Sequence, residues 1–283
     1  MMKFETVEKD SIFTRLDFRT KLLMMAVITI IAFVWESPVT GGILTLIVGI
    51  SCLFAGVKLE YLNTVFKVMI PFYILIIIVM GFFNVSQVQT LLNTETLTPI
   101  FSVPENWFWI GGLTMNQEGI VYGLNIVFKT LTMVLIIPLG IFTTDINDMV
   151  VGMVKAKIPY KVVFIFSSTL RFFPLLLEEI QGILEAQRLR GLALEKMSIF
   201  KKISVYATIA VPLILNAMAK SQKLEVVLQS KAFSGSSKRT YLHESILTQT
   251  DYIFIIGFVL LFIIATILYF QWGVGQFPWL IYS

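Results

Sequence analysis

The feature that most constrains this chain is a series of five long apolar stretches. They lie at about 22–36, 39–57, 68–85, 119–142 and 252–270. A helix needs about 20 mainly apolar residues to cross the hydrocarbon core of a bilayer, and each stretch meets or approaches that length. The first one is short unless the side chain of Lys21 snorkels to the interface. The stretches predict an all-α membrane protein with about five transmembrane helices.

The overall composition excludes a water-soluble globule. Hydrophobic residues make up 57% of the 283 residues and charged residues 14%, whereas soluble domains have about 45–50% apolar and about 25% charged residues. A soluble chain of this size would need many more charged residues to cover its surface. The apolar stretches therefore belong to a protein that is embedded in a membrane.

The distribution of Lys and Arg predicts the orientation of the chain. Residues 1–21 contain five of them, 58–67 two and 143–250 fourteen, whereas 36–38, 86–118 and 271–283 contain none. Cytoplasmic segments of membrane proteins carry the excess of Lys and Arg. We expect a multi-pass membrane protein with a cytoplasmic N-terminus and an external C-terminus.

This topology divides the chain into three regions. Residues 1–142 hold an N-terminal cytoplasmic segment and four transmembrane helices, 143–250 form a cytoplasmic region, and 251–283 hold the last transmembrane helix and an external tail. Within the cytoplasmic region, the sequence predicts a short helix at 146–157, capped by Thr144 or Asp145. It also predicts two long, partly amphipathic helices at about 160–196 and 198–233.

The cytoplasmic region is too apolar for a connector bathed in solvent. Its helices must be covered by the membrane interface, by each other or by another protein. A plain cytoplasmic cap is one interpretation, but the basic residues at the far ends of the helices favour a partner. Pro174 and Pro212 lie inside the two long helices, where they either bend the helix or are merely tolerated.

The sequence lacks the residue patterns of the common catalytic and nucleotide-binding sites. It has no G-x-x-x-x-G-K-[ST], no G-x-S-x-G and no H-E-x-x-H. A single Cys, Cys52, and a single His, His243, exclude a metal site built from several such ligands. The carboxylate pair Glu178-Glu179 is interpreted as a solvated helix face. We therefore expect no catalytic, cofactor-binding or metal-ligating residues and no enzymatic activity in this chain.

One charge falls inside a predicted transmembrane helix. Lys129 has no intramembrane carboxylate to pair with, so it makes a poor proton relay. We expect its ammonium group to snorkel or to bind a backbone carbonyl or a partner subunit.

Two candidate docking points lie near the ends of the two long cytoplasmic helices. Each has a cation beside small residues close to a helix C-terminus, where the helix dipole stabilises positive charge. Small neighbours allow the backbone of a partner to approach the cation. The residues are Leu189, Arg190 and Gly191 at the first point, with Arg188 in support, and Ser230, Lys231 and Ala232 at the second.

Four segments in this order resemble the transmembrane T component of energy-coupling factor (ECF) transporters, the EcfT/CbiQ family. Residues 11–22, SIFTRLDFRTKL, resemble the family's S-x-x-H-R-L-D-P-R-T-K-L, and residues 170–179, LRFFPLLLEE, with Arg171 and Pro174, resemble its L-R-F-x-P-L-L-x-E-E. Residues 189–191 and 230–232 stand where the family has two Ala-Arg-Gly motifs. The chain departs from these patterns at Thr14, Phe18, Leu189 and Lys231, and a lysine gives a point charge in place of a bidentate grip.

The resemblance implies a scaffold and energy-coupling subunit of an ATP-driven importer. Its implied partners are two ATP-binding cassette ATPase subunits, a membrane-embedded substrate-binding S component and the lipid bilayer, with no nucleic acid. ATP and Mg would be bound by the ATPases and no cofactor by this chain. The two Ala-Arg-Gly-type motifs would dock the ATPases, supported by Arg188, Arg171 and Pro174. The cargo would be a vitamin or a nickel or cobalt ion, and the membrane would be the cell (plasma) membrane of a prokaryote.

Two other functions remain open. A stand-alone secondary transporter requires polar or broken helices at the membrane midplane and often an internal repeat. A membrane scaffold without ATPase partners requires neither, but it does not explain the paired cationic helix ends.

Overall fold

The structure is a computed structural model that describes residues 11–83, 88–89, 97–102, 114–191, 199–233 and 247–277, with the backbone alone at 199–205 and 208. His243 therefore lies outside the described residues. The chain divides into two compact units. The first comprises Glu5–Met149 and Ser245–Ser283, and the second comprises Met1–Phe4 and Val150–Glu244.

Each of the five predicted transmembrane stretches coincides with a helix of the first unit, although four of the stretches run one or two residues past the end of the helix. After the short α1 (Ile12–Arg15), they are α2 (Phe18–Val34), α3 (Pro38–Ala55), α4 (Leu59–Phe83), α6 (Gln117–Ile141) and α10 (Gln249–Trp272). Four of these, α3, α4, α6 and α10, are long and apolar enough to cross a membrane. α2 has 17 residues, which lies at the lower limit of about 17–25 for a spanning helix.

α4 begins at Leu59, earlier than the predicted start at residue 68. Polar residues such as Glu60, Asn63 and Lys67 make this first part too polar to be recognised as part of an apolar stretch. They do not prevent helix formation, because charged straight-chain residues have good helix propensity. The apolar pattern thus predicts where α4 is apolar but not where the helix starts.

A two-stranded antiparallel ribbon was not predicted from the sequence. β1 (Pro99–Ser102) pairs with β2 (Thr114–Asn116). The Thr98 side chain, next to β1, donates a hydrogen bond to Glu118 of α6 at 2.5 Å, and Glu118 is buried. Strands of four and three residues are too short to show the alternating pattern by which strands are recognised.

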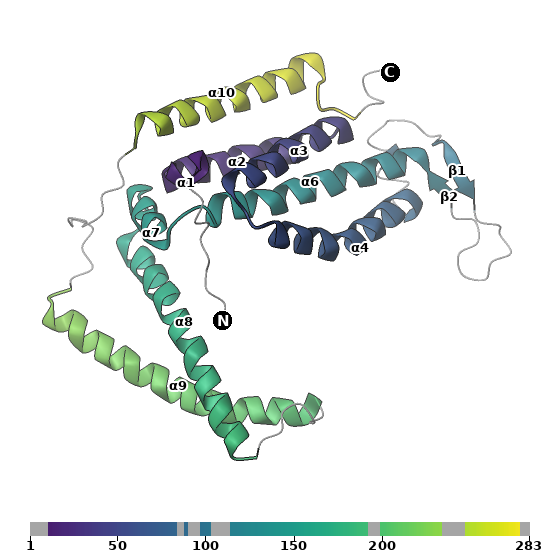
Figure 1. The fold of residues 1–283 in the computed structure, drawn as a ribbon. Helices are drawn as coiled ribbons and strands as arrows, with labels where there is room; N and C mark the ends of the chain where they lie inside the picture. The colour runs from purple at the N-terminus through teal and green to yellow at the C-terminus, as the bar shows by residue number, and fades with distance from the viewer. Residues whose placement is uncertain are drawn as a thin grey trace. The chain divides into compact units, whose positions relative to one another are not determined.

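α6 lies at the centre of the first unit, between α3 and α4 (Figure 1). Towards α3, the hydroxyl groups of Thr45 and Thr132 are 2.8 Å apart. Towards α4, a Cβ atom on Gly119 would lie 2.6 Å from the carbonyl oxygen of Met80. Glycine at this position permits close packing of two membrane helices, which is a common use of small residues in transmembrane bundles.

Lys129 of α6 binds a backbone carbonyl, one of the alternatives expected from the sequence. Its Nζ donates to the carbonyl oxygen of Phe33 at 2.8 Å and lies 5.7 Å from the centre of the Phe33 ring. The last carbonyls of a helix have no partner within the helix. Lys129 satisfies one of them at the end of α2.

Lys21 does not extend outward, so it does not lengthen the short first stretch as snorkelling would. Its side chain is 1% exposed, and its Nζ donates to the carbonyl oxygen of Thr143 at 2.7 Å and to Oγ1 of Thr144 at 2.9 Å. Thr144 is thus engaged by Lys21, and Asp145 takes the capping role. The Asp145 carboxylate accepts the backbone N–H of Asn147 at 2.8 Å.

The second unit contains most of α7 and the two long helices α8 and α9. α7 spans Ile146–Lys155, α8 Tyr160–Leu189 and α9 Ile199–Ser230, so all three end before the predicted residues 157, 196 and 233. Both α8 and α9 continue through their prolines, Pro174 and Pro212. α8 is also long and apolar enough to cross a membrane, because residues 160–177 contain only two charges, Lys161 and Arg171.

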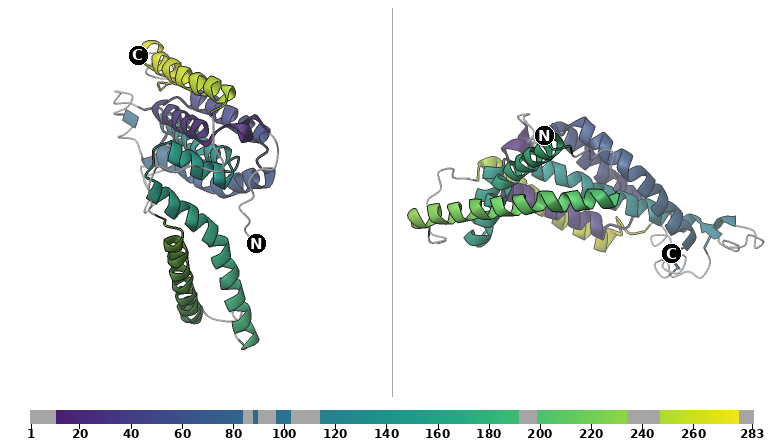
Figure 2. Two further views of the ribbon diagram at one scale, coloured as in Figure 1. Left: turned by 90° about the vertical axis from the view of Figure 1, so that its left-hand side faces the viewer. Right: turned by 90° about the horizontal axis from the view of Figure 1, so that it is seen from below.

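α8 and α9 run in opposite directions and cross (Figures 1 and 2). At the crossing, Glu179 accepts hydrogen bonds from Lys220 Nζ at 2.5 Å and from Asn216 Nδ2 at 2.6 Å. Near the start of α8, the ring of Phe233 lies 4.6 Å from that of Phe164, centre to centre. Glu179 is thus an interhelical contact, and of the pair interpreted as a solvated face only Glu178 is exposed.

Candidate docking surface

The end of α8 presents the first predicted docking point on an exposed helix end. Arg190 is the C-cap residue, and its N–H donates to the carbonyl oxygen of Gln187 at 3.1 Å. Gly191 follows with φ +90°, and its N–H donates to the carbonyl oxygen of Arg188 at 3.0 Å. Leu189 is 91% exposed, and no described atom lies within 4 Å of a Cβ built on Gly191. The backbone next to Arg190 is therefore open to a partner.

The end of α9 presents the second point through a Schellman turn. The N–H of Phe233 donates to the carbonyl oxygen of Leu228 at 2.9 Å, and the N–H of Ala232 to that of Gln229 at 3.0 Å. These are the two bonds of that motif, which normally has glycine at the left-handed position. Ala232 occupies it here with φ +51°. Lys231, just before the turn, is exposed.

The two ends share one local geometry. In each, a cation directly after the last helical residue is followed by a residue in the left-handed conformation, Gly191 after Arg190 and Ala232 after Lys231. The sequence indicated the cations but not the turn at Ala232, because alanine rarely adopts a positive φ. The glycine that follows Lys231 in the sequence, Gly235, lies outside the described residues.

Both cations are available for binding. Arg188, Arg190 and Lys231 are exposed, and within the described ranges no carboxylate lies within 4.0 Å of any of them. Positive charge at a helix C-terminus is stabilised by the helix dipole by about 0.3–1 kcal/mol. Each helix end therefore holds its cation favourably and leaves its side chain exposed.

The two docking points lie at opposite ends of the helix pair formed by α8 and α9. Phe233, two residues after Lys231, packs against Tyr160 and Phe164 at the start of α8, whereas Arg190 stands at its end. A rise of 1.5 Å per residue separates the two points by roughly 40 Å. The two cations are therefore too far apart to form one continuous charged patch.

The supporting residues Arg171 and Pro174 do not adjoin either docking point. Both are exposed on the first half of α8. They precede Arg190 by roughly 24–29 Å along the helix axis. Of the predicted support, only Arg188 adjoins a docking cation directly.

Comparison with known proteins identifies the family. The model of the CbiQ family, described as "Cobalt transport protein", matches residues 9–242. The energy-coupling factor transporter transmembrane protein EcfT of Acidaminococcus fermentans is 25% identical over 268 residues, which cover 92% of each chain. EcfT of Brevibacillus brevis is 26% identical over 266 residues, covering 91% of this chain and 94% of its own. EcfT of Streptococcus thermophilus is 25% identical over 240 residues, covering 82% and 84%.

The family model spans both units of the chain and includes residues 11–22, 170–179, 189–191 and 230–232, which carried the resemblance. The relatives align over nearly their full length, so the match does not rest on one shared segment. The chain belongs to the CbiQ family and is the transmembrane component of an energy-coupling factor transporter.

Proposed function

We propose that this chain is the scaffold and energy-coupling subunit of an ATP-driven importer, and that α8 and α9 each dock one ATPase subunit. Arg190 and Lys231 are the docking cations, with Leu189, Gly191, Ser230 and Ala232 forming the surrounding backbone. The observation that carries this proposal is the repeated geometry of the two exposed helix ends, placed at opposite ends of one helix pair. ATP and Mg are bound by the ATPases.

The helix pair couples the two ATPases mechanically. When the ATPases close on ATP, they displace the two helix ends, and stiff helices transmit such displacements where flexible loops would absorb them. The contact of Glu179 with Lys220 and Asn216 supports a joint motion, because it ties α8 to α9 at their crossing. In this proposal α8 and α9 lie on the cytoplasmic side of the membrane. Arg171 and Pro174 support docking indirectly, as part of α8, and do not contact the ATPase.

The cargo is bound by a separate membrane-embedded S component. We propose a vitamin or a nickel or cobalt ion as its substrate. The motion of the helix pair reaches the S component through the membrane helices of the first unit, in a prokaryotic cell membrane with the N-terminus of this chain in the cytoplasm. The Lys and Arg distribution supports this orientation, with fourteen such residues in 143–250.

The alternatives are a stand-alone secondary transporter and a scaffold without ATPase partners. A transporter that works alone requires ionisable or unwound segments at the midplane. Lys129, the ionisable residue in the middle of a predicted span, instead binds the end of α2. This observation favours the importer over a stand-alone transporter.

Charge reversal at each helix end tests the proposal. Arg190→Glu or Lys231→Glu should each remove one ATPase from the purified complex, and the double variant should remove both. An arginine at the centre of an interface contributes about 2 kcal/mol or more, or roughly 30-fold in Kd. The measurement is the ratio of ATPase to chain after affinity purification from membranes.

Lys223→Glu is the matched control. Lys223 is an exposed lysine on the same helix as Lys231, about two turns before it. This variant should keep both ATPases. A double variant of Arg190 and Lys231 that retains a full complement of ATPases would refute the docking proposal.

A further inference from the structure

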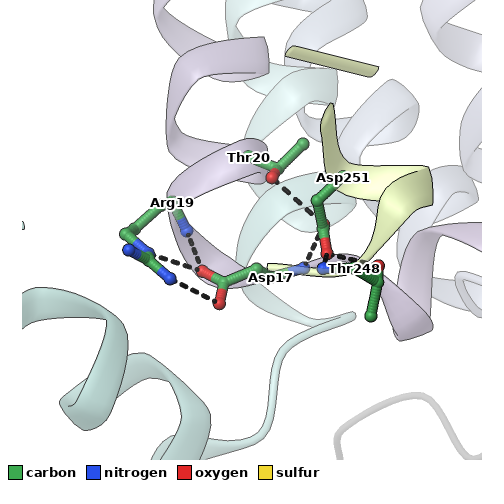
Figure 3. A network of polar contacts seen from close by, with 5 residues as sticks. All are labelled: Asp17, Arg19, Thr20, Thr248 and Asp251. Carbon is green, nitrogen blue, oxygen red and sulfur yellow. Dashed lines mark hydrogen bonds and ion pairs between the residues drawn. The ribbon is translucent and has the colours of Figure 1, made fainter. Parts of the chain in front are cut away.

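Residues 17–21, here called the anchor segment, form the first turn of α2 and play no part in the docking surface. Asp17 is the N-cap residue of α2, and its carboxylate accepts the N–H of Arg19 at 2.8 Å and binds the Arg19 guanidinium (Figure 3). Thr20 and Lys21 follow with exposed fractions of 0% and 1%. Their side chains point to other parts of the chain.

The anchor segment binds the start of α10 through a buried carboxylate. Asp251 is 1% exposed, and its Oδ1 accepts the N–H of Asp17 at 2.8 Å and the hydroxyl of Thr20 at 3.1 Å. Its Oδ2 accepts the N–H and the hydroxyl of Thr248, at 2.9 and 2.6 Å. One carboxylate thus caps α10 with one oxygen and holds α2 with the other (Figure 3).

The anchor segment also binds the end of α6. The ammonium group of Lys21 donates hydrogen bonds to the carbonyl oxygen of Thr143 and to the hydroxyl oxygen of Thr144, just after α6 ends at Ile141. A cation is favoured at that end of a helix. α2 and α6 are close here, because a Cβ on Gly140 would lie 2.1 Å from Sδ of Met25.

The two bound positions adjoin the places where the chain leaves the first unit and returns to it. The chain leaves after Met149 and returns at Ser245. Thr143 and Thr144 precede the exit by a few residues, and Thr248 and Asp251 follow the return by a few. The residues that flank segment 150–244 on its two sides are therefore both bound to one turn of α2.

We propose that the anchor segment is the common fixed point through which movement of α8 and α9 reaches the membrane helices. Thr20, Lys21 and Asp251 are positioning residues in this role. With both connections tied to α2, displacement of the helix pair must move α2, α6 and α10 together. Without these bonds the connections absorb the displacement, and ATP hydrolysis becomes uncoupled from the membrane unit. This inference rests on the proposed function.

Thr20→Val tests the anchor, because it keeps the side-chain shape and removes the hydroxyl donor. The whole complex is purified from membranes, and its amide exchange is compared with and without MgATP and vanadate. Losing a hydrogen bond to a charged group should speed exchange in the first turn of α10 about 10-fold. The nucleotide-dependent change in α2 and α10 seen in the wild-type complex should be lost, while ATPase content and hydrolysis rate stay at wild-type values.

Three further variants separate positioning from plain stability. Thr20→Ser restores the hydroxyl and should restore the nucleotide response. Thr266→Val is the matched control, because Thr266 lies in α10 but donates to Phe262 of its own helix at 2.8 Å, and it should behave as wild type. Lys21→Met removes the hydrogen bonds to Thr143 and Thr144 at the end of α6 and should speed amide exchange at residues 143–149.

A wild-type nucleotide response in α2 and α10 of the Thr20→Val complex would overturn the anchor while leaving the docking proposal intact. Failure of both the Thr20→Val and the Lys21→Met chains to fold would also overturn it, since the segment would then serve stability alone. A wild-type preparation without ATPase subunits would overturn the proposed function, and the anchor with it.

Discussion

At the scale of single residues, each docking point combines a cation with a left-handed residue, and the two points differ in the cost of that turn. Gly191 adopts φ +90° without a steric penalty, whereas Ala232 adopts φ +51°. A left-handed conformation costs a residue with a Cβ about 1–2 kcal/mol. The turn after Lys231 is therefore held less firmly than the turn after Arg190.

Ala232→Gly should strengthen the end of α9. Removing the Cβ relieves the left-handed conformation, partly offset by the entropy of glycine in the unfolded chain, for a net gain of about 0.5–1 kcal/mol. The N–H of Phe233, which closes the turn on Leu228, should then exchange about two- to five-fold more slowly. Ala219→Gly is the control, because Ala219 is an exposed interior residue of α9 and glycine there should speed local exchange. Equal effects of the two substitutions would contradict the assigned turn.

The positions of Arg190 and Lys231 at helix ends followed from the local sequence. The partners of the two lysines in the membrane helices did not, because they are distant in the chain. Lys129 binds the carbonyl of Phe33, one of the alternatives that the sequence left open. Lys21 binds Thr143 and Thr144, which lie more than a hundred residues away. No local pattern brings such groups together.

At the scale of helices, the close packing of α4 against α6 depends on glycine. The Cβ that an alanine would add at Gly119 meets backbone atoms, with the carbonyl oxygen of Met80 at 2.6 Å and Cα of Gly81 at 3.0 Å. Backbone cannot move aside as a flexible side chain can. The contact therefore has no room for a larger residue.

Gly119→Ala should destabilise the protein by about 1–3 kcal/mol, the usual cost of overpacking. Thermal unfolding of the detergent-solubilised chain measures the effect as a lower Tm. Gly257→Ala provides the comparison, because Gly257 lies in α10 with no described atom within 4 Å of an added Cβ. That substitution should leave the Tm unchanged or raise it slightly. A Tm that falls equally in both variants would contradict the assigned packing.

The helices themselves were largely predictable from apolar length, but their ends and mutual contacts were not. Each predicted span matches one helix to within one or two residues at its C-terminal end, while the start of α4 at Leu59 was missed because its first residues are polar. The ribbon of β1 and β2 was missed because its strands are very short. The crossing of α8 and α9 at Glu179 was missed because ion pairs between separate helices leave no periodic signal.

At the scale of the whole molecule, the chain divides into two compact units, and the second contains α8 and α9. The two docking points lie at opposite ends of this helix pair. The anchor segment binds residues that flank segment 150–244 on both sides. In the proposed function each end of the helix pair docks one ATPase subunit, so we expect a defined number of partners.

The most direct test of the central claim is the mass of the intact wild-type complex. The chain is extracted with its partners in a mild detergent and weighed by native mass spectrometry. Two exposed helix ends roughly 40 Å apart predict one copy of this chain with two ATPase subunits and one small membrane protein. A chain recovered alone, or with a single ATPase subunit, would contradict the account.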